Sequence, residues 1–150
     1  GQGPPCHPDS MIIFLRLLFL TVLGVMTWGT LRASMAQGMF DIPSAVTSNP
    51  WFQVTLFDAY FAFLTACVWI AWKEQRTVAR VLWVIAVLLW GNFAIATYML
   101  IELFRIPTTG SLDEVFTRKR PGSIPLPATL AALGAIVYLA SARSLLTGAS

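Results

Sequence analysis

Residues 51–72 read WFQVTLFDAYFAFLTACVWIAW, an apolar run that contains one charged side chain, Asp58. As a helix with a rise of about 1.5 Å per residue, this run would be about 33 Å long, close to the hydrocarbon thickness of a bilayer. Tryptophan stands at both ends of the run, as expected where aromatic rings lie at the membrane interfaces. Asn49 and Pro50 precede it, and a side-chain cap followed by proline is a typical helix start. The run therefore predicts a membrane-spanning helix.

The composition of the whole chain also indicates a membrane protein. Of the 150 residues, 57% are hydrophobic and 11% are charged, and the mean hydropathy is +0.70. Soluble globular chains contain about 25% charged residues, so this chain has too few to cover a soluble surface. The formal net charge is +3, and the basic residues are scattered at the ends of apolar runs. We therefore expect the lipid bilayer as a partner and no nucleic acid.

Three further apolar segments predict the remaining helices, at about 11–31, 78–104 and 124–146. The expected fold is all-α, an integral membrane bundle of four transmembrane helices that forms a single domain over residues 11–150. Residues 1–10 have no apolar periodicity and look like a disordered start, or like residues from a cloning vector or an upstream sequence, so we exclude them from the fold. The first segment has an alternative interpretation as a cleaved signal peptide, because residues 34–36 resemble a small-x-small cleavage site.

The sidedness of the predicted bundle depends on the number of spans. Four spans place the N- and C-termini on the same side, and the Lys and Arg residues of the connections then divide equally between the two sides. The basic residues from Lys73 to Arg80 flank two helix ends, which favours a cytoplasmic N-terminus. The expected location is a bacterial inner (plasma) membrane.

Asp58 is the first candidate for a functional role. It lies about 12 Å below the start of its helix by helix rise, and a charge at a helix centre costs about 2.5–3.5 kcal/mol on insertion scales. An antiparallel hairpin of 51–72 and 78–104 would bring Tyr98 and Glu102 into the same half of the membrane. Asp58, Tyr98 and Glu102 are therefore the catalytic candidates, because burial raises a carboxyl pKa and permits acid–base chemistry.

A ligand site is predicted around the same residues. Thr65 and Trp69 lie near the face of Asp58 at helical steps of three and four. The candidates for ligand binding are Asp58, Thr65, Trp69, Asn92 and Tyr98. Each polar candidate also has a structural interpretation: Asp58 and Asn92 could join helices by hydrogen bonds, and Glu102 could be an interfacial residue.

Several chemistries are excluded by the residues present. The single histidine, His7, lies in the excluded start, so a haem or metal site with His ligands is not expected. Cys6 and Cys67 lie in unlike surroundings and form no Cys-x-x-Cys pair, so we expect neither a disulfide nor a thiol redox centre. The chain has no Gly-rich phosphate loop. No cofactor and no metal are predicted.

The stretch from Asp58 to Phe104 resembles an uncharacterised family of small multipass membrane proteins. The resemblance rests on Asp58-x-Tyr60, Trp69-Ile70-Ala71-Trp72-Lys73-Glu74, Leu82-Trp83 and Gly91-Asn92, with Tyr98 seven residues after Gly91. Asn92 and Glu102 stand where that family usually has other polar side chains. The resemblance implies a four-helix membrane protein and no particular activity.

A second likeness is to the four-helix superfamily of sterol isomerases and the sigma-2 receptor. In that superfamily a Trp-Phe pair before an acidic second helix lines a sterol cavity, and Trp51-Phe52 before Asp58 is similar. The likeness implies a hydrophobic ligand of sterol type.

The sequence favours a structural, accessory or ligand-binding membrane protein over an enzyme. The alternative is an enzyme or receptor for a sterol- or isoprenoid-like molecule that uses Asp58. A further alternative is a proton or ion path in an oligomer. A homo-oligomer or a membrane protein partner stays open, because Ala128 and Ala132 have the small-xxx-small spacing that lets helices approach closely.

Overall fold

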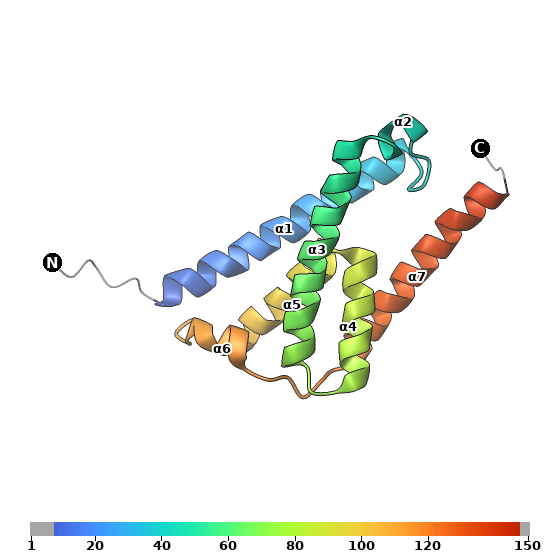
Figure 1. The fold of residues 1–150 in the computed structure, drawn as a ribbon. Helices are drawn as coiled ribbons and strands as arrows, with labels where there is room; N and C mark the ends of the chain where they lie inside the picture. Colours follow the sequence, from blue (N-terminus) through green and yellow to red (C-terminus); the bar gives the residue numbers. More distant parts are fainter. Residues whose placement is uncertain (1–7, 148–150) are drawn as a thin grey trace.

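The computed structural model describes residues 8–147, which form helices and no named strand. The elements are α1 (Pro8–Ala36), α2 (Ser44–Thr47), α3 (Pro50–Lys73), α4 (Thr77–Trp90), α5 (Asn92–Arg105), α6 (Leu112–Thr117) and α7 (Pro125–Leu146) (Figure 1). The all-α class is confirmed. Within the N-terminal start, residues 1–7, with Cys6 and His7, lie outside the described residues, and Pro8 already belongs to α1.

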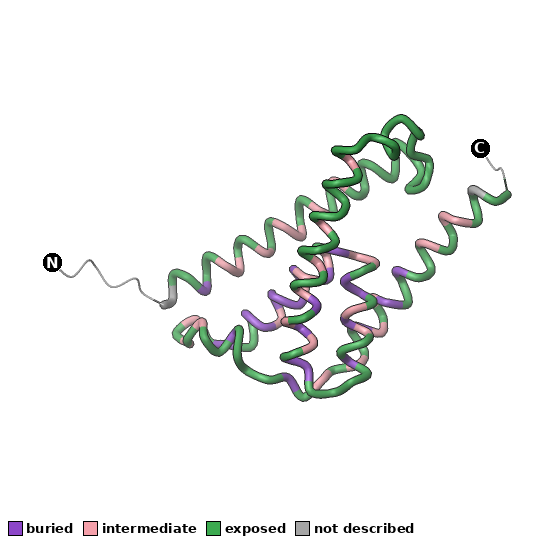
Figure 2. Tube along the Cα trace, in the orientation of Figure 1, coloured by how far each residue is buried: buried purple, intermediate pink, exposed green. Residues whose placement is uncertain are grey.

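Three helices are long and apolar enough to cross a membrane. They are Ser10–Ala36, Pro50–Lys73 and Pro125–Ser144, with 27, 24 and 20 residues. Most of their surface is uncovered, as the exposed stretches of α1 and α7 in Figure 2 show. Uncovered apolar helices of this length suit contact with lipid, and they suggest a membrane location. The predicted cap is also present, because Asn49 Oδ1 accepts hydrogen bonds from the backbone N–H groups of Trp51 and Phe52.

The prediction of one helix over 78–104 is wrong, because the helix breaks at Gly91. The φ of Gly91 is +53°, which favours glycine, and its N–H donates to the carbonyl of Val87 at 2.7 Å. The resulting helices α4 and α5 have 14 residues each. Each is therefore about 21 Å long, less than the roughly 30 Å of a bilayer core. The four predicted spans are not confirmed, and three long helices are found.

The chain turns back at Gly91, so α4 and α5 form a short helical hairpin at the centre of the bundle (Figure 1). Helix α3 packs across the hairpin through a core made of Cys67, Ile70, Trp83, Ala86, Val87, Ala94 and Tyr98. Helix α1 packs on α5, where Ile12 belongs to one buried cluster with Met99 and Leu103. Helix α7 packs on α4, where the Trp90 indole donates to the carbonyl of Leu130 at 2.7 Å. Each of the three long helices, α1, α3 and α7, therefore packs against the hairpin.

The two ends of the bundle differ in polarity. At the first, which we name the charged end, α1 begins, α3 and α5 end, and α4 and α7 begin. There Arg16 donates to the carbonyls of Leu103 and Ile106, at 2.8 and 2.7 Å, which satisfies backbone groups at the end of α5. At the other, the distal end, α1 and α7 end and α3 begins (Figure 1).

Candidate functional site

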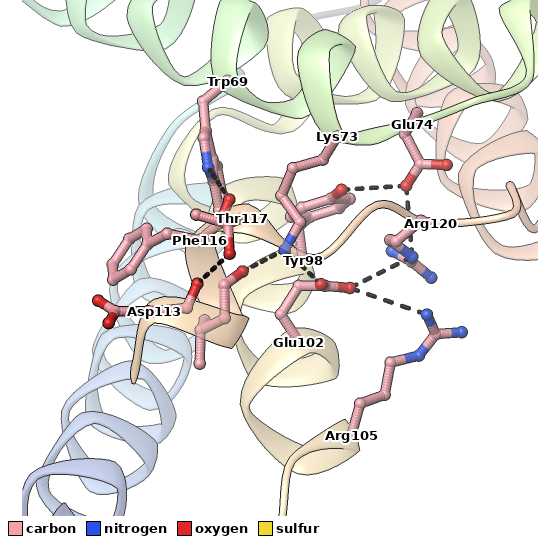
Figure 3. A network of polar contacts seen from close by, with 11 residues as sticks. Trp69, Lys73, Glu74, Tyr98, Glu102, Arg105, Asp113, Phe116, Thr117 and Arg120 are labelled. Atoms are coloured by element: carbon pink, nitrogen blue, oxygen red, sulfur yellow. Dashed lines mark hydrogen bonds and ion pairs between the residues drawn. The ribbon is translucent and has the colours of Figure 1, made fainter. Parts of the chain in front are cut away.

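Four charged side chains are buried together at the charged end, although the sequence places them near helix ends or in loops. They are Lys73, Glu74, Glu102 and Arg120. Lys73 and Glu74 close α3, Glu102 lies in the last turn of α5, and Arg120 follows α6. Figure 3 shows these side chains pointing toward one another around Tyr98. We name them, with Tyr98, the charge cluster.

Backbone pairing brings Arg120 to the end of α3. Its N–H donates to the carbonyl of Lys73 at 2.9 Å, and its carbonyl accepts from the N–H of Gln75 at 3.0 Å. This short bridge fixes the segment between α6 and α7 against the turn between α3 and α4. The guanidinium group of Arg120 is thereby held among carboxylates that come from two other elements.

The ion pairs of the charge cluster link three parts of the chain. Lys73 Nζ lies 2.5 Å from Glu102 Oε2 and also donates to the carbonyl of Val115. Arg120 Nε lies 3.3 Å from Glu74 Oε1 and 3.2 Å from Glu102 Oε1. Two positive and two negative charges therefore balance inside the protein. Buried charges of this kind need such pairing, because an unpaired buried charge is strongly destabilising.

Tyr98 is held from several sides. Its hydroxyl donates to Glu74 Oε1 at 3.0 Å, and its ring packs edge-to-face on Trp83 and Trp69 with centroid distances of 4.9 and 5.5 Å. Burial raises the pKa of Glu74, while the positive charge of Arg120 and the hydrogen bond from Tyr98 lower it by less. The fixed geometry and balanced charge suit a clamp between helices rather than an exchangeable proton donor.

A second feature is an apolar pocket of 520 Å³ on the distal side of the hairpin turn. It is lined by Met26, Thr27, Thr30, Leu31, Ser34, Met39, Leu89, Trp90, Phe93, Gly134, Val137 and Tyr138. These residues come from α1, from the ends of α4 and α5 at the hairpin turn, and from α7, with Met39 from the loop after α1. Across this loop the rings of Phe40 and Tyr138 meet edge-to-face at 6.0 Å. The pocket volume lies in the range typical of small-molecule sites, about 300–1,000 Å³.

Few polar groups enter the apolar pocket. The hydroxyl of Thr27 donates to its own helix at Leu23, and that of Tyr138 donates to the carbonyl of Leu89 at 3.1 Å. The hydroxyls of Thr30 and Ser34 make no hydrogen bond within the described part of the chain. An apolar wall with a few such groups is the usual design of a site for a small hydrophobic molecule.

The structure separates the predicted site residues into two groups. Tyr98, Glu102 and Trp69 lie in or beside the charge cluster. Asp58 is exposed on α3, and Thr65 is exposed and bonded to its own helix at Phe61. The expected meeting of Asp58 with Tyr98 and Glu102 does not occur, because the turn at Gly91 returns α5 to the end of α3 rather than to its start.

Asn92 is exposed beside the hairpin turn. It lies next to Phe93 of the apolar pocket but does not line that pocket. The functional roles assigned to Asn92, Asp58 and Thr65 stay predictions.

Sequence reasoning missed Lys73, Glu74 and Arg120 as parts of one site. The first two directly follow an apolar run, and Arg120 lies in a loop with both signs of charge, so each has the pattern of a solvated residue. The motif Trp72-Lys73-Glu74 of the resemblance was the one available signal, and it includes Lys73 and Glu74 but not Arg120. Among residues 8–147, no group of three or more His, Cys, Asp or Glu side chains could hold a metal ion.

A family profile described as "Protein of unknown function (DUF1475)" matches residues 6–123. The match includes the whole charge cluster and the hairpin, and it ends before α7. No curated protein and no solved structure matches the chain, so the second likeness, to the sterol isomerases, gains no support. The chain belongs to the DUF1475 family of proteins of unknown function.

Proposed function

We propose that this membrane protein binds a compact hydrophobic molecule with a hydrogen-bonding group, of sterol or isoprenoid type, in the apolar pocket. The observation that carries the proposal is the pocket itself, 520 Å³ in volume and lined by two long helices and the hairpin turn. The hydroxyls of Thr30 and Ser34 would bond the polar group of the ligand. This ligand-binding role keeps the sequence-based hypothesis but moves the site from Asp58 to the far side of the hairpin.

The position of the pocket also supports a hydrophobic ligand. With α1, α3 and α7 as spanning helices, the hairpin enters the membrane from the charged end and turns back within it. Non-helical backbone at that depth must be covered by protein or face a cavity, since lipid cannot satisfy its polar groups. Tyr138 bonds one carbonyl of the turn, and the apolar pocket occupies the space beyond it. A molecule that reaches the pocket would come from the hydrocarbon phase.

We further propose that the charged end faces the cytoplasm of a bacterial inner (plasma) membrane. If α4 and α5 form a hairpin that enters and leaves the membrane on the same side, the Lys and Arg residues are no longer divided equally between the two sides of the membrane. Of the ten Lys and Arg residues, those at the charged end are Arg16, Lys73, Arg76, Arg80, Arg105, Arg118, Lys119 and Arg120. Arg32 and Arg143 lie toward the distal end. The positive-inside rule then favours a cytoplasmic start of α1 and an external end of α7.

The test is mass spectrometry of molecules retained by the protein in nanodiscs. Val137→Trp fills the pocket, and Ile136→Trp on the outer face of α7 is the matched control because Ile136 is 61% exposed. We expect a defined hydrophobic compound with wild type and with Ile136→Trp, and its loss with Val137→Trp at an unchanged melting temperature. Bulk lipid alone in all three samples would contradict the proposal.

A further inference from the structure

A second pocket lies at the charged end, away from the apolar pocket, and its chemistry is opposite. It has a volume of 310 Å³ and is lined by Glu102, Arg105, Ile106, Arg118, Lys119, Arg120 and Pro121. Four of these seven residues are basic and one is acidic. We name it the cationic pocket.

The acid of the cationic pocket does not neutralise it. Glu102 is shared between Lys73, which lies outside the pocket lining, at 2.5 Å and Arg120 at 3.2 Å. Its distance to Arg105 is 4.0 Å, the limit of an ion pair, and Arg105 is 45% exposed. The acids of the neighbouring helix α6, Asp113 and Glu114, do not line the pocket. A net positive charge therefore remains on its wall.

Two of the basic groups have unused hydrogen-bond capacity. Arg120 is 3% exposed, and its Nη1 is buried with no hydrogen-bond partner among the described residues. The guanidinium group of Arg118 makes no hydrogen bond or ion pair within that part of the chain. Lys119 differs, because its ammonium donates to the carbonyl of Trp72 and lies 3.5 Å from the ring centroid of that residue. A buried guanidinium donor without a partner is costly, so an acceptor is expected there.

Arg120 and Arg105 also lie on the same side of Glu102 with their guanidinium groups facing one another (Figure 3). One carboxylate oxygen, Glu102 Oε1, lies 3.2 Å from Arg120 Nε and 4.0 Å from Arg105 Nη1, so a single negative charge faces two guanidinium groups. A second anion near them would offset the remaining repulsion. Guanidinium groups present paired N–H donors that match the oxygens of phosphate. We infer that the cationic pocket binds a phosphate group, carried either by an anionic lipid or by a free phosphate in the cytoplasm.

The position of the cationic pocket allows the phosphate group to come from a lipid or from solution. The pocket lies next to the ends of α5 and of the segment that leads into α7, where a lipid headgroup would meet the protein if the long helices span the bilayer. It is also open to solvent at Arg105 and Arg118. The phosphate site is separate from the site of the apolar ligand, because the two pockets share no lining residue.

The test uses the full chain and a double variant, Arg105→Gln with Arg118→Gln, which leaves the buried Arg120 in place. Arg76→Gln is the control, because Arg76 is an exposed cation of the same end that does not line the pocket. Two probes are compared. Inorganic phosphate is titrated in detergent against sodium chloride of equal ionic strength, with the melting temperature as the readout. Retention of phosphatidylglycerol in mixed phosphatidylcholine nanodiscs is measured by native mass spectrometry.

We expect the double variant to bind the effective probe at least about tenfold more weakly than wild type, the loss that one charge-assisted hydrogen bond would cause. Arg76→Gln should keep wild-type binding. A response to phosphate identifies a free phosphate ligand, and selective retention of phosphatidylglycerol alone identifies a lipid headgroup. The inference is overturned if neither probe binds wild type above its baseline, or if the double variant binds as well as wild type.

Discussion

Lys73 Nζ lies 2.5 Å from Glu102 Oε2, so the last residue of α3 is joined to the last turn of α5 inside the protein. In a bundle of four spanning helices these two residues would lie on opposite faces of the membrane. Their contact requires the chain to turn back between them, which it does at Gly91. The ion pair thus forms because the hairpin brings the two helix ends together, and it also holds these ends in place.

The first prediction concerns this ion pair. Lys73→Met should lower the free energy of unfolding by about 3–5 kcal/mol, because the charge cluster is left with two buried carboxylates and one buried cation. Lys73→Met combined with Glu102→Met should lose less than the sum of the single variants. Arg105→Gln, which removes a half-exposed partner, should cost about 0–1 kcal/mol. Denaturation in mixed micelles gives all of these values, and additive losses would show that the pair is not coupled.

The second prediction concerns the turn. Gly91→Ala should destabilise the protein by about 1–2 kcal/mol for its positive φ alone, and more because a Cβ would lie 2.7 Å from the ring of Phe63. Gly29→Ala is the control: Gly29 lies inside α1, and nothing lies within 4 Å of the position that a Cβ would take there. That substitution should be neutral or stabilise by about 0.5–1 kcal/mol. Equal thermal stability of the two variants would show that the turn at position 91 does not require glycine.

The third prediction separates three spans from four. In a cysteine-free background, a single cysteine at Gln75, Thr109 or Ser48 is labelled with a membrane-impermeant maleimide. All three positions are exposed. The hairpin places Gln75 and Thr109 on one side and Ser48 on the other. We expect intact cells to label Ser48→Cys alone, and labelling of Thr109→Cys together with Ser48→Cys would support four spans.

The fourth prediction concerns Asp58. Asp58 is exposed, and its carboxylate makes no hydrogen bond or ion pair within the described residues. Asp58→Asn should therefore change the free energy of unfolding by no more than about 0.5 kcal/mol and leave the compound of the apolar pocket bound. Melting curves and nanodisc mass spectrometry test both points. Loss of that compound would return the ligand site to Asp58.

The fifth prediction follows from the pKa of Glu74, which burial raises above its usual 4.5. The folded protein then binds this proton more tightly than the unfolded chain does, so stability falls as the pH rises from about 4.5 through the raised pKa. Glu74→Gln, which cannot ionise, should flatten that part of the profile. The melting temperatures of wild type and Glu74→Gln are measured across this pH range. If both change with pH in the same way, Glu74 is not the cause of the pH dependence.

The long helices could be predicted from the sequence, but the break between α4 and α5 could not. Gly24 and Gly29 lie within α1 without interrupting it, whereas Gly91 ends a helix in an equally apolar run. The difference lies in tertiary contacts: the ring of Phe63 lies against Gly91, and α7 bonds to the residues just before it. Local sequence does not contain this information, and the topology prediction depended on it.

The candidate site could also be predicted only in part from the sequence. Tyr98 and Glu102 were predicted to act together because the expected hairpin places both in the same half of the membrane, and they do lie in one cluster. Their partners were not predictable, because the burial of Lys73 and Glu74 depends on backbone pairing with Arg120, which lies far along the chain beyond α6. The apolar pocket is likewise formed by segments far apart in sequence.

The hairpin also has a consequence for the order in which the protein is made. Helices α4 and α5 are each too short to be held in the bilayer as they leave the ribosome and the translocon. The bonds from Trp90 to Leu130 and from Tyr138 to Leu89 need a helix that is synthesised later. Assembly of the middle of this protein therefore waits for its last helix, and a nascent chain stopped before α7 would expose an unfinished hairpin to quality-control proteases.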